Sequence, residues 1–104
     1  MITRDAIQKF CQELVEAFHP QKVVLFGSHA YGSPSEGSDV DLLVVMPVEG
    51  SSARMSAKIL MRLLPPFPLD VLVRSPETLA ERLEAGDFFL QEIVQRGIVL
   101  HEAA

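Results

Sequence analysis

Two aspartates, Asp39 and Asp41, stand one residue apart and lead directly into the apolar segment 42–45. Side chains alternate between the two faces of a strand, so a strand here places both carboxylates on one side, with Cα atoms about 6.6 Å apart. At an effective dielectric constant of about 20, two negative charges at that distance repel by roughly 2–3 kcal/mol. A chain that keeps such a pair beside an apolar core is expected to hold a cation there. Carboxylate oxygens suit Mg²⁺, which commonly carries phosphates.

A third carboxylate, Asp70, lies near the start of a further apolar segment, residues 69–73. If that segment is a strand beside residues 40–46, Asp70 faces the same cavity as Asp39 and Asp41. Three carboxylates around one hollow can hold two Mg²⁺ ions about 3.5–4 Å apart, an arrangement that promotes in-line displacement at phosphorus. We therefore predict that Asp39, Asp41 and Asp70 are metal ligands and catalytic residues. The alternatives are a turn role for Asp39 and an edge position for Asp70.

A Gly-Ser pair, Gly27-Ser28, precedes Asp39 by a short spacer. Glycine allows close approach to the backbone, and the N–H groups at the start of a following helix attract phosphate oxygens. The Ser28 hydroxyl adds a hydrogen-bond donor. We predict that Gly27 and Ser28 bind the phosphates of a substrate. A simple turn is the alternative.

Length, net charge and composition limit the classes of protein to which the chain can belong. A length of 104 residues predicts a single domain over residues 1–104 with a real core. The net charge is −5, and no basic tail or stripe is large enough to hold a long nucleic acid. The one cysteine, Cys11, excludes an internal disulfide and indicates core packing. There is no signal peptide and no apolar run of about 20 residues, which predicts a cytoplasmic protein without a membrane span.

Apolar periodicity and turn residues predict the elements that position these side chains. In chain order we expect a helix from Thr3 or Arg4 to His19-Pro20, strand 22–26, a helical turn over 28–31, loop 32–38, strand 40–46, a helix from Ser51 or Ser52 to about Leu64, strand 69–73, a helix from Ser75-Pro76 to Gly86, a helix from Asp87 to Gly97, and edge strand 98–101. The strand that carries Asp41 is apolar on both faces after that residue, so it is expected to be central and covered on both sides. This order defines an α/β layer architecture, α+β by some schemes.

The motif residues resemble the signature of the DNA polymerase β-like nucleotidyltransferase superfamily, and most closely its minimal nucleotidyltransferase (MNT) branch. That signature is a Gly-Ser pair, a spacer like the one seen here, Asp-x-Asp, and a further Asp on a later strand. Gly27-Ser28, Asp39, Asp41 and Asp70 match it, and the likeness runs from the first helix to the third strand. The resemblance implies a small mixed β-sheet flanked by helices.

The same resemblance implies a Mg²⁺-dependent enzyme with a two-metal mechanism. In the family the first two aspartates ligate both ions, and the third assists the nucleophile through one of them. The reaction moves a nucleoside monophosphate from an NTP to a hydroxyl and releases pyrophosphate, and ATP is the first candidate for the NTP here. The chain departs from the commonest motif after Gly-Ser: many relatives carry Arg-Ala-Arg-Gly, and this chain has His29-Ala30-Tyr31-Gly32. The basic residues of that motif would contact the triphosphate, so the resemblance implies that His29 binds phosphate as a hydrogen-bond donor, with less charge at pH 7 than arginine. A loop residue without such a role is the alternative for His29.

Small members of the branch often pair with an HEPN-domain ribonuclease as a toxin–antitoxin couple, in which the antitoxin adenylylates a tyrosine of the toxin. The resemblance therefore implies an HEPN-domain protein as partner, in a homo- or hetero-oligomer. The chain ends soon after the predicted catalytic residues, so we expect the acceptor to dock from outside or to come from another subunit.

Other functions and roles fit some of the same residues. The changed segment 29–31 favours a non-catalytic module of the same fold that neutralises a partner by binding alone. A weaker alternative is an enzyme acting on a small molecule such as an aminoglycoside or a sugar phosphate. Three apolar residues outside the motif are interpreted as core packing rather than a docking surface: Phe88, Phe89 and Ile93. Three basic residues are interpreted as a solvated helix face rather than a phosphate site: Arg54, Lys58 and Arg62. Tyr31 is interpreted as a small core plug or a group near the nucleotide, and Glu36 as a loop residue.

Overall fold

The computed structural model describes residues 2–32, 34 and 37–103 of the chain. In chain order its elements are α1 (Arg4–Phe18), β1 (Lys22–Phe26), α2 (Ser28–Tyr31), β2 (Val40–Val45), α3 (Ser52–Leu63), β3 (Leu69–Arg74), α4 (Pro76–Glu84), α5 (Phe88–Arg96) and β4 (Ile98–Glu102). The predicted order is confirmed, with boundaries within two residues of the expected ones. The Glu36 prediction, and part of the predicted loop 32–38, lie outside the described residues. Within those residues no helix is long and apolar enough to cross a membrane.

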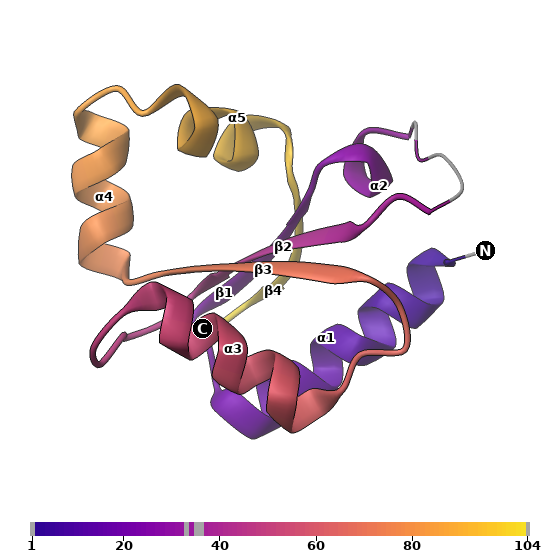
Figure 1. The fold of residues 1–104 in the computed structure, drawn as a ribbon. Coiled ribbons are helices and arrows are strands. Elements are labelled where there is room, and N and C mark those ends of the chain that lie inside the picture. The colour runs from indigo at the N-terminus through magenta and orange to yellow at the C-terminus, as the bar shows by residue number, and fades with distance from the viewer. Residues whose placement is uncertain (1, 33, 35–36, 104) are drawn as a thin grey trace.

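The described strands form one mixed sheet in the order β3–β2–β1–β4 (Figure 1). β1 pairs antiparallel with β2 and with β4, whereas β2 and β3 run parallel. α3 joins the two parallel strands, because parallel neighbours need a crossover connection. β2 is therefore an internal strand, as its apolar sequence predicts, and β4 is an edge strand. The mixed sheet flanked by helices confirms the predicted fold class.

The longer helices begin at side-chain caps, as predicted. The capping residues and the backbone N–H groups that they accept from are Thr3 and Ala6, Ser51 and Arg54, Ser75 and Thr78, and Asp87 and Leu90. Each cap satisfies an N–H group that has no partner within its own helix. The first turn of each helix is thereby fixed in the chain.

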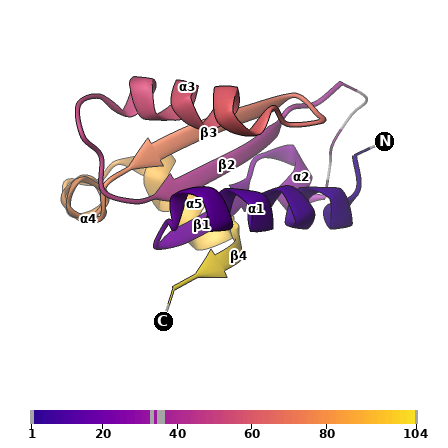
Figure 2. The same cartoon turned by 90° about the horizontal axis from the view of Figure 1, so that it is seen from below.

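Helices cover both faces of the sheet (Figures 1 and 2). The larger buried cluster lies between the sheet and the pair α1 and α3, and consists of Ile7, Phe10, Cys11, Leu14, Val23, Leu25, Val40, Leu42, Val44, Met46, Ile59, Phe67 and Val73. Burial raises the pKa of the Cys11 thiol to about 11, so this cysteine is an unreactive core residue, as predicted.

A smaller buried cluster lies on the opposite face, under α5. It consists of Val24, Phe26, Leu43, Val45, Leu90 and Ile93, with partly buried Leu72, Leu79 and Leu83 packed against it. Successive side chains of a strand point to opposite faces, so Asp41 and Asp70, two positions before Leu43 and Leu72, lie on this face. The carboxylates of Asp41 and Asp70 therefore lie on the face of the sheet that carries the smaller buried cluster.

The prediction that Phe88 and Phe89 pack in the core is wrong, whereas the same prediction for Ile93 is confirmed. Phe88 is 85% exposed and Phe89 is 55% exposed. α5 packs instead through Leu90 and Ile93, which are three positions apart and share one helix face. The two phenylalanines lie in the first turn, outside that face.

Candidate active site

Asp41 and Asp70 are register partners across the parallel strands β2 and β3. Phe26, the last residue of β1, is the register partner of Asp41 on the other side. The three residues form one row across the sheet, and neighbouring strands in such a row lie about 4.8 Å apart. Phe26 belongs to the smaller buried cluster, whereas Asp41 and Asp70 lie just beyond it. The carboxylate end of the row is therefore open to solvent while it stays close to the core.

The chain turns at Gly27, directly after β1. Gly27 has a φ angle of +74°, a conformation that residues with a Cβ atom rarely adopt. A Cβ atom at this position would collide with Oδ2 of Asp41. Glycine is therefore required by the backbone and by the close approach of the Asp41 carboxylate. The Gly-Ser pair and the Asp-x-Asp pair, separate in the sequence, are adjacent in space.

α2 starts at the Gly27 turn and, unlike the longer helices, has no side-chain cap. The N–H groups of Ala30 and Tyr31 both donate to the Gly27 carbonyl, at 3.0 and 3.1 Å. The beginning of a helical turn is a place where backbone N–H groups attract anions. The Gly27 turn therefore brings an anion-attracting backbone next to Asp41.

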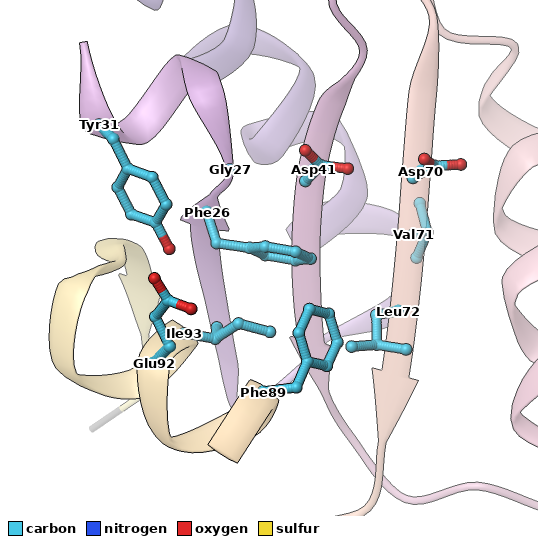
Figure 3. Close-up of a pocket in the computed structure, with 10 residues that line it drawn as sticks. All are labelled: Phe26, Gly27, Tyr31, Asp41, Asp70, Val71, Leu72, Phe89, Glu92 and Ile93. Carbon is cyan, nitrogen blue, oxygen red and sulfur yellow. The ribbon is translucent and has the colours of Figure 1, made fainter. Parts of the chain in front are cut away.

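A cleft of about 540 Å³ opens over the carboxylate row (Figure 3). Its lining residues are Phe26, Gly27, Tyr31, Asp41, Asp70, Val71, Leu72, Phe89, Glu92 and Ile93. Asp41 and Asp70 lie at one end beside Gly27, and Phe26 and Phe89 lead away from them. Small-molecule sites are commonly clefts of about 300–1,000 Å³ with apolar walls and a few polar groups. The cleft has this composition, with two carboxylates at one end and a third, Glu92, beside Tyr31 on the α5 side.

The electrostatics of the cleft centre on Asp41. Partial burial raises the pKa of the Asp41 carboxyl above its ordinary value, and the neighbouring charges of Asp70 and Asp39 raise it further. The charge of His29 acts in the opposite direction. Both raising causes disfavour the ionised form, so a cation placed at this end of the cleft would stabilise the carboxylate.

Asp39 lies near this pair but outside the cleft lining. It precedes β2 and its side chain is exposed, although its charge reaches Asp41. Within residues 2–32, 34 and 37–103, no three His, Cys, Asp or Glu side chains gather closely enough to hold a metal ion. The structure therefore brings Asp41 and Asp70 together, and a metal-ligand role for Asp39 remains a prediction.

The groups at the carboxylate end suit a Mg²⁺ ion. Asp41 and Asp70 offer only oxygen atoms, and the cleft lining contains no His or Cys side chain. Mg²⁺ is usually held by one or two carboxylates together with water and the phosphates of a substrate. Two adjacent carboxylates beside an anion-attracting turn meet that requirement.

His29 links α2 to the residue before Asp39. Its ring Nε2 lies 3.1 Å from the carbonyl oxygen of Ser38, and because a carbonyl only accepts, Nε2 donates. The backbone carbonyl of His29 accepts from Arg4 at 3.1 Å. His29 does not line the cleft, so its predicted contact with a phosphate remains a prediction.

Tyr31 lines the cleft and is only partly buried, which favours the site role over that of a core plug. The guanidinium carbon of Arg96 lies 4.2 Å from the centroid of the Tyr31 ring. Arg96 also pairs with Glu92 at 2.9 Å, and Figure 3 shows the Tyr31 hydroxyl pointing toward Glu92. These contacts tie α2 to α5 along one wall of the cleft.

Sequence reasoning did not predict six residues of the lining, which are Phe26, Val71, Leu72, Phe89, Glu92 and Ile93. Phe26 and Leu72 had a usable signal, because Phe26 directly precedes Gly27 and Leu72 follows Asp70 by two positions on the same strand face. Phe89 and Glu92 had none, since they come from α5 and reach the cleft only through the packing of that helix against the sheet.

Comparison with known proteins agrees with this geometry. The family model of the nucleotidyltransferase domain matches residues 5–101, which is nearly the whole chain. The chain therefore belongs to the nucleotidyltransferase-domain family, and the family resemblance seen in its motif residues is confirmed. Among proteins with curated descriptions, none matches the chain significantly.

Solved structures share the fold. A protein from Sulfolobus solfataricus described as a nucleotidyltransferase superposes with a TM-score of 0.61 at 18% identity, over 91% of this chain and 76% of that one. A toxin–antitoxin structure with AMP-PNP gives 0.61 at 20% identity, over 92% and 73%. A toxin–antitoxin MntA–HpeT structure, with two aspartates two positions apart changed to glutamate, gives 0.59 at 17% identity, over 92% and 73%.

Proposed function

We propose that the protein is a Mg²⁺-dependent nucleotidyltransferase that moves a nucleoside monophosphate, AMP in the first instance, from an NTP to a hydroxyl group of a partner protein. The observation that carries the proposal is the in-register pair Asp41 and Asp70, with Gly27 against Asp41, at one end of a cleft that a nucleotide can enter. The family match agrees with the reaction class.

In the proposed reaction each residue has a distinct role. Asp39, Asp41 and Asp70 would hold the Mg²⁺ ions, two in the family pattern, which when bound would neutralise charge on the triphosphate and at the attacking oxygen. The backbone at Gly27 and the hydroxyl of Ser28 would orient the phosphates, and His29 would add a donor. The acceptor oxygen forms a bond to the α-phosphorus, the bond from that phosphorus to the β-phosphate bridge breaks, and pyrophosphate leaves. Asp70 would also accept the proton of the attacking hydroxyl.

The proposed partner is an HEPN-domain toxin, with this chain as the antitoxin. Two observations support it: the motif resembles the minimal branch of the family, and solved structures with the same fold include a toxin–antitoxin complex with AMP-PNP and the MntA–HpeT complex. The paired aspartate substitutions in the second of these have the spacing of Asp39 and Asp41. A cytoplasmic location follows from the same proposal, as toxin and antitoxin would meet there.

Label transfer tests the reaction. Purified protein, Mg²⁺ and an extract of the source cells are incubated with ATP labelled at the α-phosphate, and in parallel with ATP labelled at the γ-phosphate. Label should appear on a protein from the α-labelled ATP only, because pyrophosphate carries the γ label away. The Asp39→Asn/Asp41→Asn double variant should reduce the product by about 100-fold or more, the size expected when charge stabilisation in the transition state is removed.

A matched control separates the site from surface charge in general. Asp5→Asn removes an equally exposed carboxylate from the first turn of α1, away from the cleft, and should transfer label like the wild type. Equal labelling by the wild type and the double variant would exclude the enzyme proposal for ATP, and transfer of the γ label would indicate a kinase instead.

A second candidate function is neutralisation of a partner by binding alone. Two observations favour it: the His29 ring is engaged with the Ser38 carbonyl, and Asp39 is exposed outside the cleft. In cells that express the partner toxin, this candidate predicts that the Asp39→Asn/Asp41→Asn variant protects growth like the wild type. Loss of protection in that variant, while it still binds the toxin, supports the enzyme.

A further inference from the structure

The apolar end of the cleft takes no part in the chemistry proposed at Asp41 and Asp70. It nevertheless carries an aromatic side chain that is open to solvent: Phe89 lines the cleft and is 55% exposed. Burial of a large apolar side chain is more favourable than its exposure to water. Exposed apolar surface at the edge of a cleft therefore commonly marks a binding site. The position of Phe89 therefore calls for a ligand with a flat apolar part.

Phe89 is supported from two sides. Its ring centroid lies 5.9 Å from that of Phe26, with an angle of 83° between the ring planes, and such edge-to-face contacts are favourable. The carboxylate of Asp87 accepts from the N–H groups of Leu90, at 3.1 Å, and of Phe89. Arg82 holds that carboxylate at 3.1 Å. The cap therefore positions the backbone of Phe89, and the contact with Phe26 supports one side of its ring.

The distance from the carboxylates to this ring suits one extended ligand. Asp70 and Leu72 lie two residues apart on the same face of β3, which separates their Cα atoms by about 6.6 Å. Leu72 lines the cleft next to Phe89 (Figure 3). The aromatic wall therefore begins one strand repeat away from the carboxylates, within the same cavity. A molecule with an anionic end and a flat ring at the other end would contact both.

We propose that Phe89 is the stacking surface for the base of the nucleoside triphosphate whose phosphates lie at Gly27 and Asp41. This inference rests on the proposed function and adds to it the place of the base. Every base has a π face, so stacking contributes affinity with little choice between bases. Phe89 is accordingly a nucleotide-binding residue that takes no part in the bond-making step.

Calorimetric titration with two Mg²⁺-loaded probes tests the assignment: AMP-PNP, which has a base, and inorganic tripolyphosphate, which has none. Phe89→Ala should weaken AMP-PNP binding by about fivefold or more, since loss of one base–aromatic stack costs about 1–3 kcal/mol. The same variant should bind tripolyphosphate within about twofold of the wild type, because the phosphate end of the cleft is unchanged.

The adjacent phenylalanine supplies the matched control. Phe88 is 85% exposed and does not line the cleft, so Phe88→Ala should bind both probes like the wild type. Phe89→Leu keeps an apolar contact with Phe26 and removes the aromatic face, so it should lose AMP-PNP affinity even if Phe89→Ala is poorly folded. Phe89→Trp should retain that affinity.

Several results would overturn the assignment. AMP-PNP affinity equal to wild type in both Phe89→Ala and Phe89→Leu would do so, as would an equal loss for both probes, which indicates a structural role. A wild-type protein that binds tripolyphosphate as tightly as AMP-PNP would exclude the base site and leave the phosphate site intact. A wild-type protein that binds neither probe would contradict the proposed function itself.

Discussion

Asp41 combines two unfavourable features in one side chain. It is partly buried beside an apolar cluster, and it has Asp70 as its cross-strand neighbour. Both features raise the pKa of its carboxyl, burial more than charge. A protein keeps such an arrangement at a functional site because the same carboxylates that repel each other attract a cation. The cost in folding stability and the proposed binding of Mg²⁺ therefore have one origin.

A pH-dependent difference in stability follows. The ordinary pKa of an aspartate carboxyl is 3.8, and that of Asp41 is raised in the folded protein. As the pH rises above 3.8, Asp41 therefore loses its proton in the unfolded chain before it does so in the folded chain. The free energy of unfolding falls with rising pH until the folded chain has lost this proton as well. Asp41→Asn removes that loss. Without divalent cations at pH 7, the variant should melt above the wild type, and the gap should close toward pH 3.8.

Thermal melts of the wild type, Asp41→Asn and Asp5→Asn between pH 3.5 and 7, about the range over which carboxyls titrate, check this. Asp5 lies on the surface of α1, so its variant should follow the wild type. An Asp41→Asn variant that melts below the wild type at pH 7 would show that the carboxylate stabilises the metal-free fold, contrary to this account.

Gly27 is the second residue on which the site depends. Gly27→Ala forces a Cβ atom against the Asp41 carboxylate and into a backbone conformation that alanine rarely adopts. We expect a loss of about 1–3 kcal/mol in the free energy of unfolding, measured with urea, and a fall of about tenfold or more in nucleotidyl transfer, because a misplaced catalytic group commonly costs about 100-fold.

The control for Gly27 is Gly50→Ala. Gly50 also has a positive φ angle, of +80°, but no atom lies within 4 Å of the Cβ that alanine would add there. Backbone strain should lower its stability, whereas transfer activity per folded molecule should stay at the wild-type level. If both alanine variants lose activity equally, contact between Gly27 and Asp41 is not the cause.

The motif residues could be predicted from sequence because their constraints are local. Strand parity places Asp41 on one face, and the glycine at Gly27 reflects a backbone angle and a close contact. The prediction for Phe89 failed because helical spacing identifies a buried face only after the neighbouring sheet is known. Position within the first turn of α5 decided its exposure, and no local pattern reports that.

At the scale of elements, α5 decides the shape of the cleft. It covers the carboxylate face through Leu90 and Ile93 and places Phe89 and Glu92 in the lining. Gly97 ends the helix where it meets β1: a Cβ atom there would collide with the Ile93 carbonyl and with the side chain of Val24. The helix can lie this close to the strand only because residue 97 has no side chain.

Gly97→Ala should therefore move α5 away from the sheet. We expect a loss of about 1–3 kcal/mol in the free energy of unfolding, as for overpacking of a core, measured by urea denaturation, together with weaker AMP-PNP binding. Gln95→Ala changes an exposed residue on the same helix and should alter neither quantity by a measurable amount. A Gly97→Ala variant as stable as the wild type would show that α5 can move away from β1 without a loss in the free energy of unfolding, contrary to this account.

Helix and strand positions were predictable at this scale because caps, prolines and glycines mark them. Ser75 and Asp87 cap α4 and α5 as expected, and His19 ends α1 in a left-handed conformation just before Pro20. The sheet order was predictable only in part. β2 had to be central because it is apolar on both faces, whereas the pairing of β4 with β1 rests on contacts between distant segments.

At the scale of the whole molecule, the two faces of the sheet differ in the size of the buried cluster that each carries. The face under α1 and α3 carries the larger buried cluster, and the face under α5 carries the smaller one, which ends at the row of Phe26, Asp41 and Asp70. The proposed site lies where the smaller cluster ends. The family match over residues 5–101 and the shared fold of solved structures agree with this fold.

Binding of a divalent cation with a nucleotide tests the central claim most directly. Mn²⁺, which suits the same oxygen ligands as Mg²⁺, is titrated into the protein with AMP-PNP and followed by electron paramagnetic resonance. The wild type and Asp5→Asn should form a ternary complex, and Asp41→Asn and Asp70→Asn should bind Mn²⁺ about tenfold or more weakly in it. Wild-type affinity for Mn²⁺ in both of those variants would contradict the claim that Asp41 and Asp70 hold the cation.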